Sequence, residues 1–146
     1  MFTCYTGGFK GIFDSLGIAD NAKFIFSPYK RLTKNYKGNL VKVKRTSDSA
    51  ESWFGYDSNG DLDTVSLLAW VGASDGLVME VANQYNDSYN ASQSDTDKMP
   101  KIVSGGVLES SGLLFDGIDD YLEITDYSDI QITSSPLSVY VNLDVV

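Results

Sequence analysis

The sequence predicts an all-β fold, a β-sandwich of short strands with one short helix. Apolar and polar residues alternate in runs such as Leu40–Arg45, with the period of two that turns one face of a strand toward a core. Turn signals separate the runs, among them Asn59-Gly60 and Asp116-Gly117. The chain has 146 residues, 42% of them hydrophobic, which suits one domain with a modest core.

The elements follow in order along the chain. Residues 1–27, rich in glycine and aromatic residues, predict an irregular N-terminal arm, ahead of a partial sandwich over residues 28–146. Pro28 is compatible with the start of a short helix through Thr33. The segment 63–71 predicts the packed helix, which Asp63 caps and which buries Val65, Leu67, Leu68 and Val71. Residues 83–98 predict a loop, and the predicted strands are 40–45, 52–56, 77–82, 99–103, 106–108, 113–115, 121–124 and 137–141.

The composition leaves few of the residues on which enzymes rely. The chain has no histidine, which removes the usual general base and the commonest transition-metal ligand. Cys4 is the single cysteine, so no internal disulfide and no cysteine cluster for zinc can form. These absences favour a non-enzymatic protein. No apolar run is long enough to span a bilayer and the first residues lack the features of a signal peptide, so we expect synthesis in a cytosol.

The net charge of −9 is unevenly distributed. Between Lys23 and Arg45 there are eight basic residues and no acid, whereas the rest of the chain from Thr46 has eighteen acids and only two lysines. The basic band is interpreted first as a solvated strand edge, then as a surface that docks on an acidic neighbour, and least as a phosphate contact. We therefore expect no nucleic-acid partner and no membrane insertion. The predicted assembly contacts are Phe2, Tyr5, Phe9, Phe13, Lys30, Arg31 and Lys34.

Two acidic clusters are candidate sites. The first has carboxylate and amide side chains at every second position, which suggests a calcium loop; its residues are Asp57, Asn59, Asp61 and Asp63. The EF-hand pattern fails at Leu62 and Leu68, so a solvated hairpin turn is favoured. The second cluster is interpreted as turn-building or metal-assisted loop ordering rather than a glycosidase pair; it comprises Asp116, Asp119, Asp120 and Glu123. No cofactor is predicted, and Ca²⁺ is the alternative.

The polar tract after residue 82 predicts a glycan contact. Aromatic rings beside amide groups suit sugars, which stack on rings and use their hydroxyls in hydrogen bonds. The predicted contact residues are Asn83, Gln84, Tyr85, Tyr89 and Asn90, although the same composition also fills inert loops.

Four segments together resemble a pattern of bacteriophage virion proteins that leads into a concanavalin A-like (laminin-G type) lectin domain. They are LVKVKRTSDSAE (40–51), NGDLDTVSLLAWVG (59–72), PKIVSGGVLE (100–109) and FDGIDDY (115–121). A more distant resemblance is to the catalytic β-sandwich of α-L-arabinofuranosidases. The family's WYDQSGNGNDATQ loop is here VANQYNDSYNASQ (81–93), which lacks the acid and the aromatic pair. No catalytic carboxylate of that family can be placed on this chain.

The resemblance implies a concanavalin A-like jelly-roll sandwich, incomplete because only about thirty residues follow Phe115. Either another chain completes its open edge or the polypeptide continues. The function expected is a virion structural protein, in a head- or tail-attached fibre, decoration or adhesin, that acts by assembly and host-glycan binding. Its partners would be other virion proteins or copies of itself. The alternatives are an arabinofuranosidase-like glycoside hydrolase fragment and a free carbohydrate-binding module.

Overall fold

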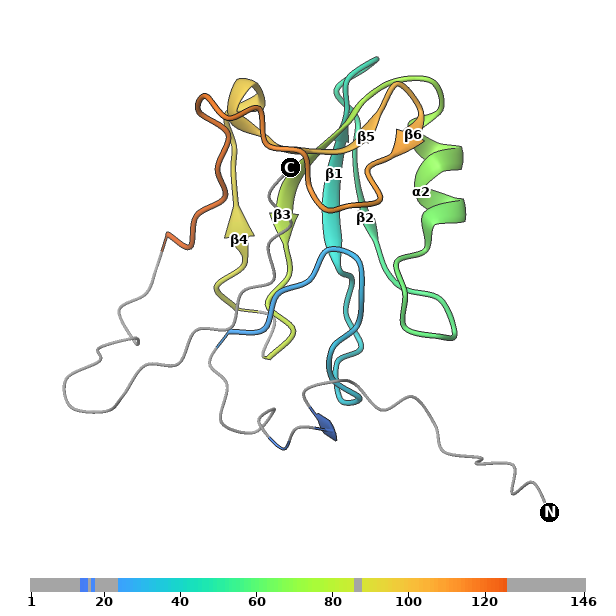
Figure 1. Ribbon diagram of the computed structural model, residues 1–146, viewed down its shortest axis with the longest axis vertical. Helices are drawn as coiled ribbons and strands as arrows, with labels where there is room; N and C mark the ends of the chain where they lie inside the picture. The colour runs from blue at the N-terminus through green and yellow to red at the C-terminus, as the bar shows by residue number, and fades with distance from the viewer. Residues whose placement is uncertain (1–13, 16, 18–23, 86–87, 126–146) are drawn as a thin grey trace.

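The described part of the chain forms one antiparallel sheet with a short helix. The computed structural model describes residues 14–15, 17, 24–85 and 88–125 (Figure 1). The strand order is β2-β1-β3-β5-β6, and β4 also pairs with β3. The all-β class is confirmed. The elements are β1 (Val41–Arg45), β2 (Glu51–Phe54), α2 (Thr64–Val71), β3 (Gly76–Val81), β4 (Ala91–Ser92), the 3-10 helix η2 (Thr96–Lys98), β5 (Lys101–Ser104) and β6 (Val107–Leu108).

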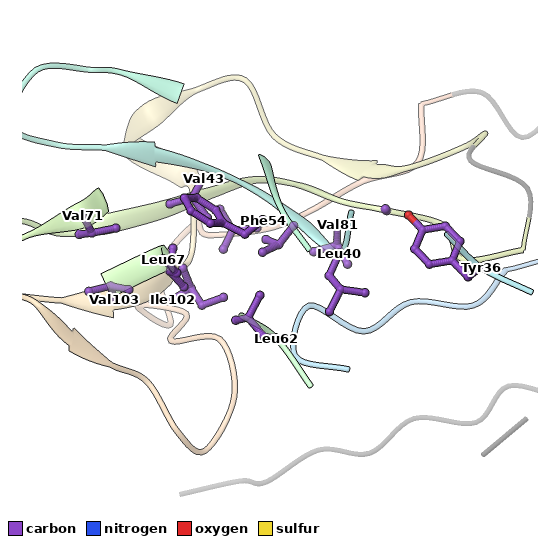
Figure 2. Packing of buried hydrophobic residues seen from close by; sticks show 13 residues of the cluster. Tyr36, Leu40, Val43, Phe54, Leu62, Leu67, Val71, Val81, Ile102 and Val103 are labelled. Carbon is purple, nitrogen blue, oxygen red and sulfur yellow. The ribbon is translucent and has the colours of Figure 1, made fainter. Parts of the chain in front are cut away.

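The core lies on one face of this sheet. Val41 and Val43 are fully buried, whereas the lysines that alternate with them are only partly buried. Side chains from α2 and from β5 pack on the same cluster (Figure 2). Gly76 permits this packing, because a Cβ there would lie 3.1 Å from Val43 Cγ1 and 3.3 Å from Val103 Cβ.

The helix α2 begins where the sequence predicts. The Asp63 carboxylate accepts hydrogen bonds from the backbone N–H and the hydroxyl of Ser66, as an N-cap does. Leu67 and Val71 are buried, one turn apart on the same side. The prediction for Val65 is wrong, since this side chain is 80% exposed. Val65 comes two residues before Leu67, a spacing that places it on nearly the opposite face of the helix.

The predicted helix after Pro28 is also wrong. Lys30 forms an antiparallel bridge with Asp61, and the Arg31 N–H donates to the Gly60 carbonyl at 2.7 Å. The Leu32 N–H donates to the side-chain oxygen of Gln84 at 2.7 Å. These partners hold the segment extended along the 57–61 turn, so tertiary contacts override the preference of proline for a helix start.

The turn and loop predictions hold in part. The hairpin turn at Asn59-Gly60 is confirmed, with Gly60 at φ +82° and Tyr56 bridged to Leu62. The tract 83–98 contains β4 and η2, so the prediction of an uninterrupted loop is wrong. Two later predicted strands are single bridges, Leu114 with Lys101 and Glu123 with Ser92. The predicted strand 137–141 lies outside the described residues.

The structure also bears on the predicted N-terminal arm, the predicted sandwich and the predicted absence of a membrane span. Within the residues predicted as an arm, Ile25 is buried and its carbonyl accepts the N–H of Gln84, so the chain joins the core from about this point. In the described residues the strands belong to a single sheet, and a second sandwich layer is not among them. No helix in the described part is long and apolar enough to cross a bilayer.

Candidate functional site

The face of the sheet opposite the core carries charged and aromatic side chains. Register places Trp53 of β2, Lys42 of β1 and Glu80 of β3 in one row across three strands. Directly opposed residues of antiparallel strands point to the same side, so these three side chains share a face. Glu51 pairs with Lys42 and Asn90 hydrogen-bonds to Glu80, so both join this row. We call the five residues the polar face, namely Lys42, Glu51, Trp53, Glu80 and Asn90.

The ammonium group of Lys42 lies between the two glutamates of the polar face. Lys42 Nζ lies 3.0 Å from Glu51 Oε2 and 3.8 Å from Glu80 Oε1. The other oxygen of Glu80 accepts a hydrogen bond from Asn90 Nδ2 at 3.2 Å. The Lys42 side chain is 23% exposed, which places the charges at the surface and in reach of a solute. Two carboxylates, an ammonium and an amide therefore lie together in the row of Trp53, whose half-buried side chain also packs against the core cluster.

This combination of groups is suited to sugars. The polar face offers ionic acceptors, cationic and amide donors, and an apolar ring, the set that a hydroxyl-rich ring with an apolar side requires. Charge-assisted hydrogen bonds are the stronger kind, so the glutamates would dominate contacts with hydroxyl groups.

Two of the predicted glycan residues lie inside the protein instead. Asn83 is fully buried, and its Oδ1 accepts hydrogen bonds from the N–H groups of Ile25 and Tyr85. Gln84 is almost fully buried, and its amide donates to the carbonyls of Ser27 and Lys30. Both side chains fasten the 24–32 segment to the end of β3, so the glycan contact predicted for them does not fit their positions.

The other three predicted glycan residues lie nearer the surface. Tyr85 is exposed, Tyr89 takes a positive φ of 60° with its ring edge-on to Phe24, and Asn90 belongs to the polar face. Their glycan contact stays a prediction. Asn90 is the point where the predicted site and the polar face meet.

The predicted assembly residues are partly engaged within the chain. Lys30 Nζ lies 2.7 Å from Asp61 Oδ1, and Arg31 is buried with its guanidinium 4.7 Å from the centre of the Tyr56 ring. Lys34 is exposed. The aromatic residues of the arm lie outside the described part of the chain, namely Phe2, Tyr5, Phe9 and Phe13. Arg31 therefore stabilises the fold, and Lys30 and Lys34 are the described assembly candidates that face solvent, Lys30 through an exposed ion pair.

The acids of the first cluster act within the fold rather than together. Asp57 Oδ1 accepts hydrogen bonds from the N–H groups of Asn59 and Asp61, Asp61 pairs with Lys30, and Asp63 caps α2. The hydrogen bonds of Ser66 hold the pKa of Asp63 below its ordinary value. These contacts agree with the interpretation of this segment as a hairpin turn.

The second cluster is a self-bonded turn. Asp116 Oδ1 accepts from the N–H groups of Ile118 and Asp119 at 2.8 and 3.2 Å, while Asp120 Oδ2 accepts from the Asp116 N–H at 2.9 Å. These backbone hydrogen bonds, above all that of Ile118, hold the pKa of the Asp116 carboxyl below its ordinary value. Three carboxylate oxygens, one each from Asp116, Asp119 and Asp120, lie within 4.8 Å of one another. Turn-building accounts for the geometry of this exposed group.

Sequence reasoning missed most of the polar face. Lys42, Glu51, Trp53 and Glu80 come from three strands, and only their register brings them together. A signal was present, because the lysines alternate with valines in β1 and must face away from the core. What the pattern does not specify is which residues of β2 and β3 lie beside them.

Comparisons with known proteins identify solved structures that are similar to this chain in fold. No family model and no curated protein matches the chain. A mutant GH54 α-L-arabinofuranosidase soaked with 4-nitrophenyl α-L-arabinofuranoside is similar, with TM-score 0.56 and 17% identity over 64% of this chain and 22% of that one. A GH54 α-L-arabinofuranosidase soaked with a cyclic sulfate inhibitor gives TM-score 0.48 and 17% identity over 53% of this chain and 19% of that one. The chain thus spans about a fifth of each of these structures.

These findings correct one prediction and leave others open. The prediction of a non-enzymatic protein is contradicted, because a solved structure with a similar fold is a glycoside hydrolase. The predicted distant resemblance to arabinofuranosidases agrees with them. The virion and lectin relationships receive no support from the comparisons. At 17% identity the likeness shows the fold alone.

Proposed function

We propose that the chain is part of a carbohydrate-active β-sandwich protein and that its polar face binds a glycan. The observation that carries the proposal is the row of Trp53, Lys42 and Glu80 across three strands, on the side of the sheet away from the core. The likeness in fold to a glycoside hydrolase supports the choice of a sugar as ligand. A sugar ring would stack on the indole and hydrogen-bond to the carboxylates.

The two glutamates give the proposal an enzymatic form. Glu51 and Glu80 lie on either side of one ammonium group, and most glycoside hydrolases use a pair of carboxylates to act on the bound sugar. Hydrolysis and binding therefore call for one set of measurements, made on the same preparation.

The first experiment uses 4-nitrophenyl α-L-arabinofuranoside as the probe. Binding is followed by calorimetry and hydrolysis by nitrophenol release, for the wild type, Glu51→Gln and Glu80→Gln. Glu109→Gln serves as the control, because Glu109 follows β6, which β5 separates from the strands of the polar face. We expect at least tenfold weaker binding for Glu80→Gln, from the loss of a charge-assisted hydrogen bond of about 1.5–3 kcal/mol, and no change for Glu109→Gln. Equal loss in all three variants, or no binding by the wild type, would overturn the proposal.

A second candidate is the virion role expected from the sequence. The observation in its favour is the group of exposed large apolar residues in and after β6, which suits a protein that is assembled into a larger particle. It comprises Val107, Leu114, Phe115, Ile118 and Tyr121. This role is compatible with a carbohydrate-active sandwich that contacts host glycans. Co-purification of the chain in stable stoichiometric complex with other virion proteins supports it, and a chain that stays free in their presence contradicts it.

A further inference from the structure

An ordered turn after β6 presents an apolar residue to solvent. Ile118 is 85% exposed, the highest exposure of any large apolar residue among those described. The turn that carries it is fixed by the hydrogen bonds of Asp116 and Asp120. The Leu114 N–H and carbonyl bond to Lys101 at one end of the segment, and Glu123 bonds to Ser92 at the other. Ile118 is therefore held in place, so covering it would cost little conformational entropy.

The surroundings of Ile118 combine apolar and acidic groups. Leu114, Phe115 and Tyr121 are also exposed, and the carboxylates of Asp116, Asp119 and Asp120 gather in the same turn. We call residues 114–121 the acidic knob. A surface of this composition fits a partner with an exposed apolar group rimmed by cations.

The opposite end of the molecule has that composition. The side chains of Lys34 and Lys37 are exposed and form no ion pair with another described residue, while the backbone N–H of Lys34 donates to Asp14 Oδ2 at 2.6 Å. Tyr85 is exposed too, and it follows Gln84, whose side-chain oxygen accepts the N–H of Leu32, two residues before Lys34 in the chain. We call Lys34, Lys37 and Tyr85 the basic end. Figure 1 draws the orange segment after β6 toward the top of the longest axis and the loop before β1 at its bottom.

We propose that the chain associates head to tail, with the acidic knob of one copy docking on the basic end of the next. The two surfaces are complementary in charge, and each lies on every copy. Because they sit at opposite ends of the molecule, they cannot meet within one chain, and a contact of this kind adds copies in a row. The proposal is independent of the polar face, which lies on the side of the sheet, and it specifies the surfaces for the self-association that the sequence predicts.

The test is sedimentation velocity of the full chain across a wide concentration range. We expect association at low ionic strength that weakens in about 1 M salt, where the Debye length is about 3 Å. Ile118→Ser is expected to weaken it about tenfold or more, the loss of a buried aliphatic side chain. Val65→Ser is the matched control, since Val65 is 80% exposed but lies on α2. Circular dichroism confirms that both variants fold.

Charge reversal identifies the occupant. Asp119→Lys and Lys34→Glu should each weaken association, and the double variant should regain part of it because both surfaces are then reversed on every copy. A wild type that stays monomeric at low salt overturns the proposal. Equal effects of Ile118→Ser and Val65→Ser, or association indifferent to Lys34→Glu, show that the knob does not dock on the basic end and overturn it as well.

Discussion

The carboxylate of Asp75 lies 2.8 Å from the ammonium group of Lys101. The same carboxylate accepts the N–H of Gly105 at 2.7 Å, so one side chain joins the residue before β3 to both ends of β5. We predict that Asp75→Ala lowers the free energy of unfolding by about 1–3 kcal/mol, since two donors lose their acceptor. Urea denaturation measures this. Asp97→Ala, at an exposed carboxylate, is the control and is expected to change little.

Acid is expected to destabilise the fold through several aspartates. The Lys101 ammonium and the Gly105 N–H hold the pKa of Asp75 below its ordinary value. The Arg45 guanidinium lowers the pKa of Asp48 to about 2. Because these pKa values are lower in the folded state, their stabilisation is present above the unfolded value of about 3.9 and is lost as pH falls from there toward about 2.

The measurement is urea denaturation at a series of pH values. The free energy of unfolding should fall below about pH 4, and Asp75→Asn should make that fall shallower because the variant has one linked carboxylate fewer. A wild type with constant stability between about pH 4 and pH 2 would contradict the assignment of these ion pairs.

Gln84→Ala is predicted to destabilise the protein through the loss of hydrogen bonds rather than through the loss of apolar packing. The buried Gln84 amide donates to the carbonyls of Ser27 and Lys30 and accepts the N–H of Leu32, in three part-buried hydrogen bonds. Truncation leaves these groups without their partner, at a cost of about 2–4 kcal/mol. Thermal unfolding of Tyr85→Ser, an exposed neighbour, gives the baseline. Similar melting temperatures for both variants would refute the anchoring role.

Gly105 and Gly106 provide a matched pair in the β5–β6 turn. Both have positive φ, but a Cβ on Gly106 would lie 2.7 Å from the Gly72 carbonyl oxygen, whereas one on Gly105 would meet nothing within 4 Å. Gly105→Ala should therefore cost about 1–2 kcal/mol of backbone strain. Gly106→Ala should cost a further 1–3 kcal/mol or so, because the turn must move away from α2. Denaturation midpoints compare the two, and equal losses would show that the close approach is unimportant.

Local patterns predicted the elements that depend on neighbours in sequence. The alternation in residues 40–45 gave β1, and the Asp63 cap gave the start of α2. The helix predicted for the segment 28–33 is wrong because the partners that hold this segment extended, Gly60 and Gln84, are about thirty and fifty residues away in the sequence. The burial of Gln84 has the same origin, since an amide in a polar tract looks like a surface residue until its distant carbonyl partners are known.

The candidate site depended on register more than on composition. The polar tract predicts Asn90 as a glycan contact, which stays a prediction, and the structure places Asn90 in the polar face through its hydrogen bond to Glu80. Trp53 and Glu80 could not be joined to it from the sequence. A bulge near Val43 shifts β3 against β1 by one residue, and a shift of one residue decides which face a side chain takes.

The central claim is that the polar face binds a glycan through Trp53. The chain has two tryptophans, and Trp70 lies on α2 with its ring against Phe54 and under the Arg45 guanidinium. Two-dimensional proton–nitrogen NMR follows both indole N–H signals during titration with 4-nitrophenyl α-L-arabinofuranoside. The account predicts a saturable shift of the Trp53 signal with the Trp70 signal unchanged. No shift of either signal, or a shift of Trp70 alone, would contradict it.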